Sequence, residues 1–202
     1  DEVTQMQVVA TLERIAEEHM LPALNSMLEA FPFKIRGFHT DNGSEYINYS
    51  VAELLEKLRI TFTKSRPRHS NDNGLVESKN GSVVRKLYGY SHIPQHCADR
   101  FSEVNSGPLY RYVNFHRPCY FPSTITDKKG KQKKVYRYDD MMTPYEKFRS
   151  LSRASQYLKP GVTFKKLDAF AREMTDNEAV EILHSARDNL FKQIHERLKM
   201  RT

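Results

Sequence analysis

Two carboxylates, Asp41 and Glu77, lie where a folded chain could use them as metal ligands. Asp41 follows a short alternating apolar run, and Glu77 lies in the first turn of an expected helix, directly after a polar loop. Ligands gather at strand ends in open α/β sheets. Each acid alone also fits a structural role, because Asp-Asn-Gly is a common turn and a helix N-terminus stabilises an acid in its first turn.

The context of these acids resembles the catalytic core of DDE recombinases, the RNase H-like group that includes retroviral integrases and bacterial insertion-sequence transposases. The stretches that carry the resemblance are FHTDNGSEY (38–46), ITFT (60–63) and SRPRHSNDNGLVESKNG (65–81). YVNFHRP (112–118) and MTPYEKF (142–148) resemble the segments that follow the Glu in the transposases. The resemblance covers about residues 1–150.

The resemblance implies that Asp41 and Glu77 are the second and third members of a catalytic acidic triad. Two Mg²⁺ ions, or Mn²⁺ ions, about 3.5–4 Å apart can serve both oxygens of an in-line displacement at phosphorus. Carboxylates are the hard oxygen ligands that such ions prefer, so the acids are expected to be ligands and not nucleophiles.

The first acid of the triad lies on the first strand of the sheet in this family, well before the second. Asp1 is too close to Asp41 for that position, and DEVTQMQVVATL resembles the family's second strand. We therefore expect the first Asp upstream of residue 1, and we expect this chain alone to bind metal weakly and to be inactive. Asp72 is another candidate, but its place beside Glu77 favours a role in shaping the loop.

Basic residues around the two acids are candidates for binding double-stranded DNA. Lysine and arginine near a metal site position phosphates and make binding salt-dependent. The segment 128–137 holds six basic residues and no acid, which fits a polyanion, although a solvated lysine-rich loop has the same composition. The candidates are Lys64, Arg66, Arg68, His69, Lys79, Asn80, Arg85, Lys86, Lys128, Lys129, Lys131, Lys133 and Lys134.

The helix that carries Glu77 departs in part from the retroviral pattern. Asn80, three positions after Glu77, matches it. Gly81 and Val84 stand where retroviral integrases carry lysines that face DNA. How this helix contacts DNA is therefore left open by the resemblance.

Composition limits the class of protein. The 202 residues are 39% hydrophobic with a net charge of +7, which suits a folded, basic domain. Apolar runs are too short to cross a membrane, and two cysteines, Cys97 and Cys119, exclude a disulfide framework or a cysteine-rich zinc module. We expect a bacterial, cytoplasmic, nucleoid-associated protein. The chain starts without Met or a signal peptide, so we expect a fragment.

Hydrophobic periodicity predicts an α/β order up to residue 88. Strands are expected at 3–12, 33–39 and 60–63, and helices at 11–28, 51–58 and 75–88. Further helices are expected near 97–105 and 109–116, with a break at Gly107-Pro108, and then at 143–148 and 177–199. Thr175 and Glu178 form a capping box for the last helix, whose apolar stripe should pack within the chain or across a dimer.

These observations predict an α/β RNase H-like integrase core, a mixed sheet flanked by helices, that lacks its first strand. Residues 1–118 would form this core, 119–150 a basic insertion with the end of the core, and 151–202 a helical C-terminal region. The expected function is Mg²⁺-dependent cleavage and strand transfer of mobile-element DNA by a homo-oligomeric DDE polynucleotidyl transferase. The alternatives are an RNase H-like nuclease that does not join strands and a catalytically inactive DNA-binding protein.

Overall fold

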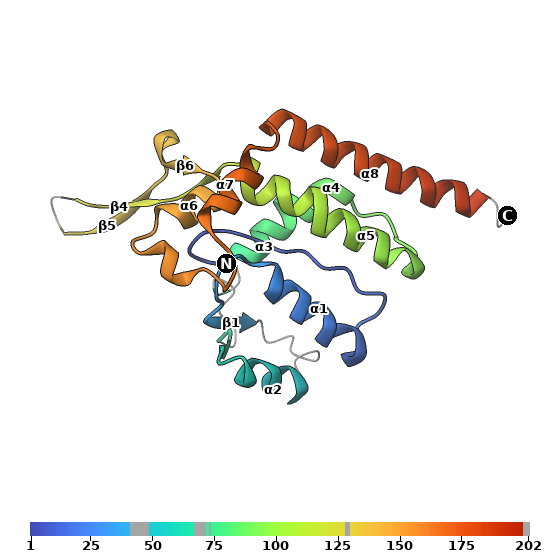
Figure 1. Cartoon of the computed structure of the whole chain (residues 1–202), viewed down its shortest axis with the longest axis horizontal. Coiled ribbons are helices and arrows are strands. Elements are labelled where there is room, and N and C mark those ends of the chain that lie inside the picture. The colour runs from blue at the N-terminus through green and yellow to red at the C-terminus, as the bar shows by residue number, and fades with distance from the viewer. Residues whose placement is uncertain (41–48, 67–71, 73, 128–129, 200–202) are drawn as a thin grey trace.

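The computed structural model describes residues 1–40, 49–66, 72, 74–127 and 130–199 (Figure 1). Asp41, Arg68, His69, Lys128 and Lys129 lie outside the described residues. None of the helices within the described ranges is both long and apolar enough to span a membrane.

The first half of the chain contains α1 (Glu17–Ala30), β1 (Gly37–Thr40), α2 (Tyr49–Lys57), β2 (Thr61–Lys64), α3 (Gly74–Lys79), the π-helical segment η3 (Asn80–Arg85) and α4 (Lys86–Tyr88). A 3₁₀ turn, η4 (Gln95–Cys97), leads into α5 (Ala98–Val104), which continues through the π-helical segments η5 (Asn105–Leu109) and η6 (Tyr112–His116). The second half contains β3 (Cys119–Tyr120), β4 (Ser123–Thr126), β5 (Gln132–Val135), η7 (Tyr138–Asp140), β6 (Met141–Met142), α6 (Pro144–Ser150), η8 (Ala154–Tyr157), α7 (Phe164–Arg172) and α8 (Asp176–Lys199).

A β1–α2–β2 unit is built as the periodicity predicts. The two strands pair in parallel, in a register that runs from Gly37 opposite Thr61 to Thr40 opposite Lys64. Val51 and Leu55 of α2 are buried in one cluster with Leu28 and Ile60, which holds the helix against the sheet. Two parallel strands need such a crossover connection, because the chain must return to the starting edge of the sheet before it can form the second strand. The first strand begins at Gly37, later than expected.

The predicted strand at 3–12 is wrong. Residues 2–4 form a turn, Gln5 has a φ of 57°, and the segment pairs with no described strand. Asn114 exchanges two hydrogen bonds with the backbone of Gln7, and Asn105 and Ser102 bind Thr11. The β-branched residues favour an extended chain, but amide side chains from the helix at 98–116 take the place of a neighbouring strand.

The predicted break at Gly107-Pro108 is also wrong. Helical structure continues from Ala98 to His116, and Pro108 lies inside the π-helical segment η5. A π-helical turn changes the hydrogen-bond pattern locally, which accommodates a residue without an N–H. The helix at 75–88 is confirmed, but Val76 is 70% exposed and does not lie on its buried face.

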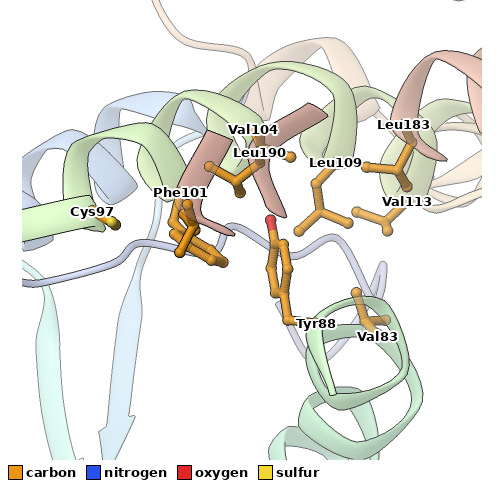
Figure 2. Packing of buried hydrophobic residues seen from close by; sticks show 10 residues of the cluster. Val83, Tyr88, Cys97, Phe101, Val104, Leu109, Val113, Leu183 and Leu190 are labelled. Atoms are coloured by element: carbon orange, nitrogen blue, oxygen red, sulfur yellow. The ribbon is translucent and has the colours of Figure 1, made fainter. Parts of the chain in front are cut away.

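The largest buried cluster joins the helices 74–88 and 98–116 to α8 (Figure 2). The rings of Tyr88 and Phe101 meet edge to face at 4.9 Å. The apolar stripe of α8 packs within the chain, with Leu183 and Leu190 buried in this cluster. The predicted capping box is confirmed, because Glu178 N donates to Thr175 Oγ1 and Thr175 N donates to Glu178 Oε2.

A second buried cluster contains residues from each of the three predicted domains, 1–118, 119–150 and 151–202. Phe148 of α6 lies 4.8 Å from the ring of Phe33 and 5.5 Å from that of Phe164. The described residues form three two-stranded sheets, namely β1–β2, β3–β6 and β4–β5. A larger RNase H-like sheet and the domain boundaries at 118 and 150 therefore stay predictions.

Candidate metal and nucleic-acid site

Hydrogen bonds connect the carboxyl end of β1, which directly precedes Asp41, to the residues at the end of β2. Thr40 is the last residue of β1, and its carbonyl oxygen accepts hydrogen bonds from Ser65 N at 2.8 Å and Ser65 Oγ at 3.0 Å. The ring of His39 lies between Thr63 Oγ1 at 2.9 Å and Ser65 Oγ at 3.0 Å. These bonds connect the ends of the two parallel strands and fix the residue that precedes Asp41.

The ring of His39 connects the two strand ends. One ring nitrogen contacts Thr63 and the other contacts Ser65, whose hydroxyl also donates to the Thr40 carbonyl. His39 therefore acts as a structural bridge at the strand ends, and no motif in the sequence pointed to this role.

Glu77 lies in the first turn of α3, as predicted, and its side chain is exposed. Within the described parts of the chain, its carboxylate forms no hydrogen bond or ion pair. An ionised carboxylate with unshared oxygens is the donor that a hard divalent cation needs. The described residues contain no group of three or more His, Cys, Asp or Glu that could hold a metal.

Asp72 is engaged by Arg66. The Arg66 guanidinium donates to Asp72 from Nε at 3.1 Å and from NH2 at 2.8 Å, and the Arg66 backbone N donates at 3.1 Å. The hydrogen bond to Asp72 raises the pKa of Arg66. Asp72 thus joins the two ends of the loop before Glu77, in agreement with its predicted shaping role, and it compensates the charge of a predicted DNA-binding residue.

Lys79 is turned toward the second half of the chain. Its Nζ donates to Cys119 Sγ at 3.2 Å, and Arg117 donates to the Ser82 carbonyl at 3.4 Å. These contacts fasten the helix that carries Glu77 to β3. No sequence signal predicted this contact, because Lys79 and Cys119 lie 40 positions apart.

The other predicted DNA-binding residues in the described ranges are exposed but form separate groups. Lys64 lies beside the end of β1, with its Nζ 5.6 Å from the Phe62 ring centre. Arg85 stacks over Tyr90 at 5.7 Å. Lys131, Lys133 and Lys134 are exposed on the β4–β5 hairpin, which projects to one side of the molecule (Figure 1). Asn80 and Lys86 are exposed on the helix after Glu77.

The histidines and cysteine that precede α5 are divided between surface and core. His92 and His96 are exposed, whereas Cys97 is buried in the largest cluster.

Comparisons with known proteins connect part of the chain with a viral protein. An uncharacterized protein, y4rM, of Sinorhizobium fredii is 32% identical over 104 residues, which are 52% of this chain and 29% of that protein. The Pol polyprotein of Equine infectious anemia virus, in the Wyoming strain and in isolate 1369, is 31% identical over 77 residues, which are 38% of this chain and 7% of the polyprotein. The matched stretches thus span less than a third of the length of these relatives. No family model and no solved structure matches the chain.

Proposed function

We propose that this chain is part of a DDE-type enzyme that cleaves and joins mobile-element DNA, with Asp41 and Glu77 among its metal-binding carboxylates. The observation that carries the proposal is the β1–α2–β2–α3 order, in which Asp41 directly follows a parallel strand and Glu77 lies in the first turn of a helix. The Glu77 carboxylate is exposed and pairs with no residue in the described ranges. The similarity to a Pol polyprotein supports it independently.

Asp41 and Glu77 would hold Mg²⁺ or Mn²⁺, which when bound activates water or a DNA 3′-hydroxyl and stabilises the leaving oxygen. The chain's own residues would prepare this site. The bonds among Thr40, Ser65 and His39 hold the strand ends in place. Lys64, exposed beside Thr40, would attract a phosphate of double-stranded DNA to the same edge.

The test begins with metal binding by the full chain. Mn²⁺ titrations followed by electron paramagnetic resonance compare the unmodified chain with Asp41→Asn and Glu77→Gln. Removing either ligand should weaken binding at least about tenfold. Glu56→Gln is the matched control, because Glu56 is an exposed acid on α2. Equal binding by all four proteins would contradict the proposal.

Activity assays then separate the candidate functions. End-labelled duplex DNA reports cleavage as shortened strands and strand transfer as joined products. The proposed enzyme forms both, and Asp41→Asn or Glu77→Gln in the longest form of the protein abolishes both. Cleavage without joining would favour a nuclease. DNA binding that persists without metal-dependent products would favour an inactive DNA-binding protein.

A further inference from the structure

The base of the β4–β5 hairpin carries three tyrosines, and the ring of one contacts the rings of the other two. Tyr136 and Tyr138 both contact Tyr120, with ring centres 6.4 Å and 5.9 Å apart and interplanar angles of 86° and 76°. Tyr120 lies in β3, and the other two follow β5. These three residues are called the tyrosine cluster below.

The tyrosine cluster faces solvent. Tyr138 is 81% exposed, Tyr136 60% and Tyr120 40%. Core aromatics of this chain, such as Phe101 and Phe148, are by contrast only 1% exposed. A contiguous exposed aromatic patch marks a contact surface more often than a scattered single ring does.

Cationic side chains extend from the cluster along the hairpin. Lys131, Lys133 and Lys134 are exposed and form no ion pair with any described residue. Lys133 pairs across the ladder with Ile125, and Lys134 pairs with Thr124, so the two lysines lie on opposite faces of the ribbon. Tyr136 comes two positions after Lys134, the spacing that returns an extended chain to the same face.

The hairpin base is fixed to the body of the protein. Tyr120 pairs with Met141 in the β3–β6 ladder, and the Tyr120 carbonyl accepts a hydrogen bond from Gln5 at 2.8 Å. Ser123 Oγ donates to Asp140 at 2.7 Å. The contact from Lys79 to Cys119 ties the residue before Tyr120 to the helix that carries Glu77. The rings are therefore presented on a supported surface.

We propose that the tyrosine cluster and the hairpin lysines bind single-stranded DNA. Unpaired bases would stack on the exposed faces of Tyr136 and Tyr138, and Lys134, on the same face as Tyr136, would contact a flanking phosphate. Aromatic rings in a basic groove are the general means of binding unpaired nucleotides. Paired bases offer only their edges in the grooves of a duplex, so exposed ring faces favour unpaired strands. This inference goes beyond the proposed catalytic function and does not depend on it.

The test measures binding to a fluorescein-labelled 20-nucleotide mixed-sequence strand, by anisotropy with the full chain in EDTA. The Glu77→Gln chain should bind equally, which separates this surface from catalysis. Tyr138→Ala and Tyr136→Ala should each weaken binding between about 5-fold and about 150-fold, the range for loss of one base stack. Tyr138→Phe should retain binding because the ring remains. Tyr49→Ala is the matched control, since Tyr49 is 83% exposed and lies on α2.

Two further measurements make the inference refutable. Lys134→Ala should lower the slope of log K against log salt by about 0.7, the value for one phosphate contact on a single strand. Because the chain contains no Trp, its intrinsic fluorescence comes from tyrosine, and base stacking should quench it less in Tyr138→Ala. Unchanged affinity in both alanine variants, with native circular dichroism, would overturn the proposal. A loss of duplex affinity in Tyr136→Ala and Tyr138→Ala as large as their loss of single-strand affinity would also overturn it.

Discussion

The side chain of Asn114 is predicted to hold the first twelve residues on the protein. It is fully buried and makes three hydrogen bonds. Its Oδ1 accepts from Gln7 N at 2.9 Å, and its Nδ2 donates to the carbonyls of Gln7 at 2.8 Å and Tyr110 at 2.9 Å. Asn114→Ala removes all three bonds at once.

The expected loss in the free energy of unfolding comes from the backbone groups of Gln7 and Tyr110 that Asn114→Ala leaves without a partner. A buried backbone group left without a partner costs about 1–3 kcal/mol. Gln7 is only partly buried, so water recovers some of that cost. Two such groups, with the cavity of the missing amide, give a loss of about 2–4 kcal/mol, a large share of the roughly 5–15 kcal/mol that stabilises a domain.

Urea unfolding followed by far-ultraviolet circular dichroism measures this loss, and hydrogen exchange with mass spectrometry shows where it falls. The peptide at 1–12 should lose protection before the helices do. Asn114→Asp preserves the shape but turns a carboxylate oxygen toward two carbonyls, so its penalty should be greater at pH 7 than at pH 4. Asn25→Ala is the control, because Asn25 is exposed on α1. A free energy of unfolding within about 0.5 kcal/mol of the unmodified chain, with 1–12 still protected, would refute this reasoning.

Three more predictions concern stability. Phe148→Ala should destabilise the chain by about 3–5 kcal/mol in urea unfolding, since the ring is buried between Phe33 and Phe164, and a loss below 1 kcal/mol would contradict the packing. Burial raises the pKa of Tyr110 to about 12, above its unfolded value near 10, so the stability it contributes is present below pH 10 and is lost as pH rises from 10 to 12. In thermal melts, Tyr110→Phe should reduce the fall of the melting temperature between pH 10 and 12. An unchanged fall would show that ionisation of Tyr110 does not cause it. Thr143→Ala should cost about 1 kcal/mol by removing the capping box with Glu146, and recovery in Thr143→Ser would identify the hydroxyl as the cause.

Sequence periodicity was sufficient to predict an element where the residues of that element alone determine its structure. The helix α2 and the strand β2 appear at the predicted places because their apolar spacing matches the face they bury. The capping box of α8 is local in the same way, since Thr175 and Glu178 need only each other.

Prediction failed where distant residues decide. Residues 3–12 read as a strand, but Ser102 and Asn114, about a hundred positions away, supply the backbone partners. Pro108 was predicted to break the helix, but the helix continues past it, and the next residue, Leu109, is buried in the largest cluster. The tyrosine cluster was missed because Tyr120 meets its partners only after β3 and β6 pair.

The candidate site was predicted in part. The first-turn position of Glu77 is confirmed, and the exposure of its carboxylate suits a ligand. Thr40 ends a parallel strand, so the strand end before Asp41 is confirmed as well, whereas Asp41 itself lies outside the described residues. The contact of Lys79 with Cys119 shows why a basic residue near an acid need not face DNA.

A crystal of this chain soaked in Mn²⁺ and measured for anomalous diffraction would show directly whether Asp41 and Glu77 share a metal ion. We expect an Mn²⁺ ion at the end of β1, with carboxylate oxygens of Asp41 and Glu77 about 2.1 Å from it. A peak that is lost in Glu77→Gln crystals and kept in Glu56→Gln crystals would support it further. Ordered Asp41 and Glu77 carboxylates held far apart, with no metal between them, would contradict it.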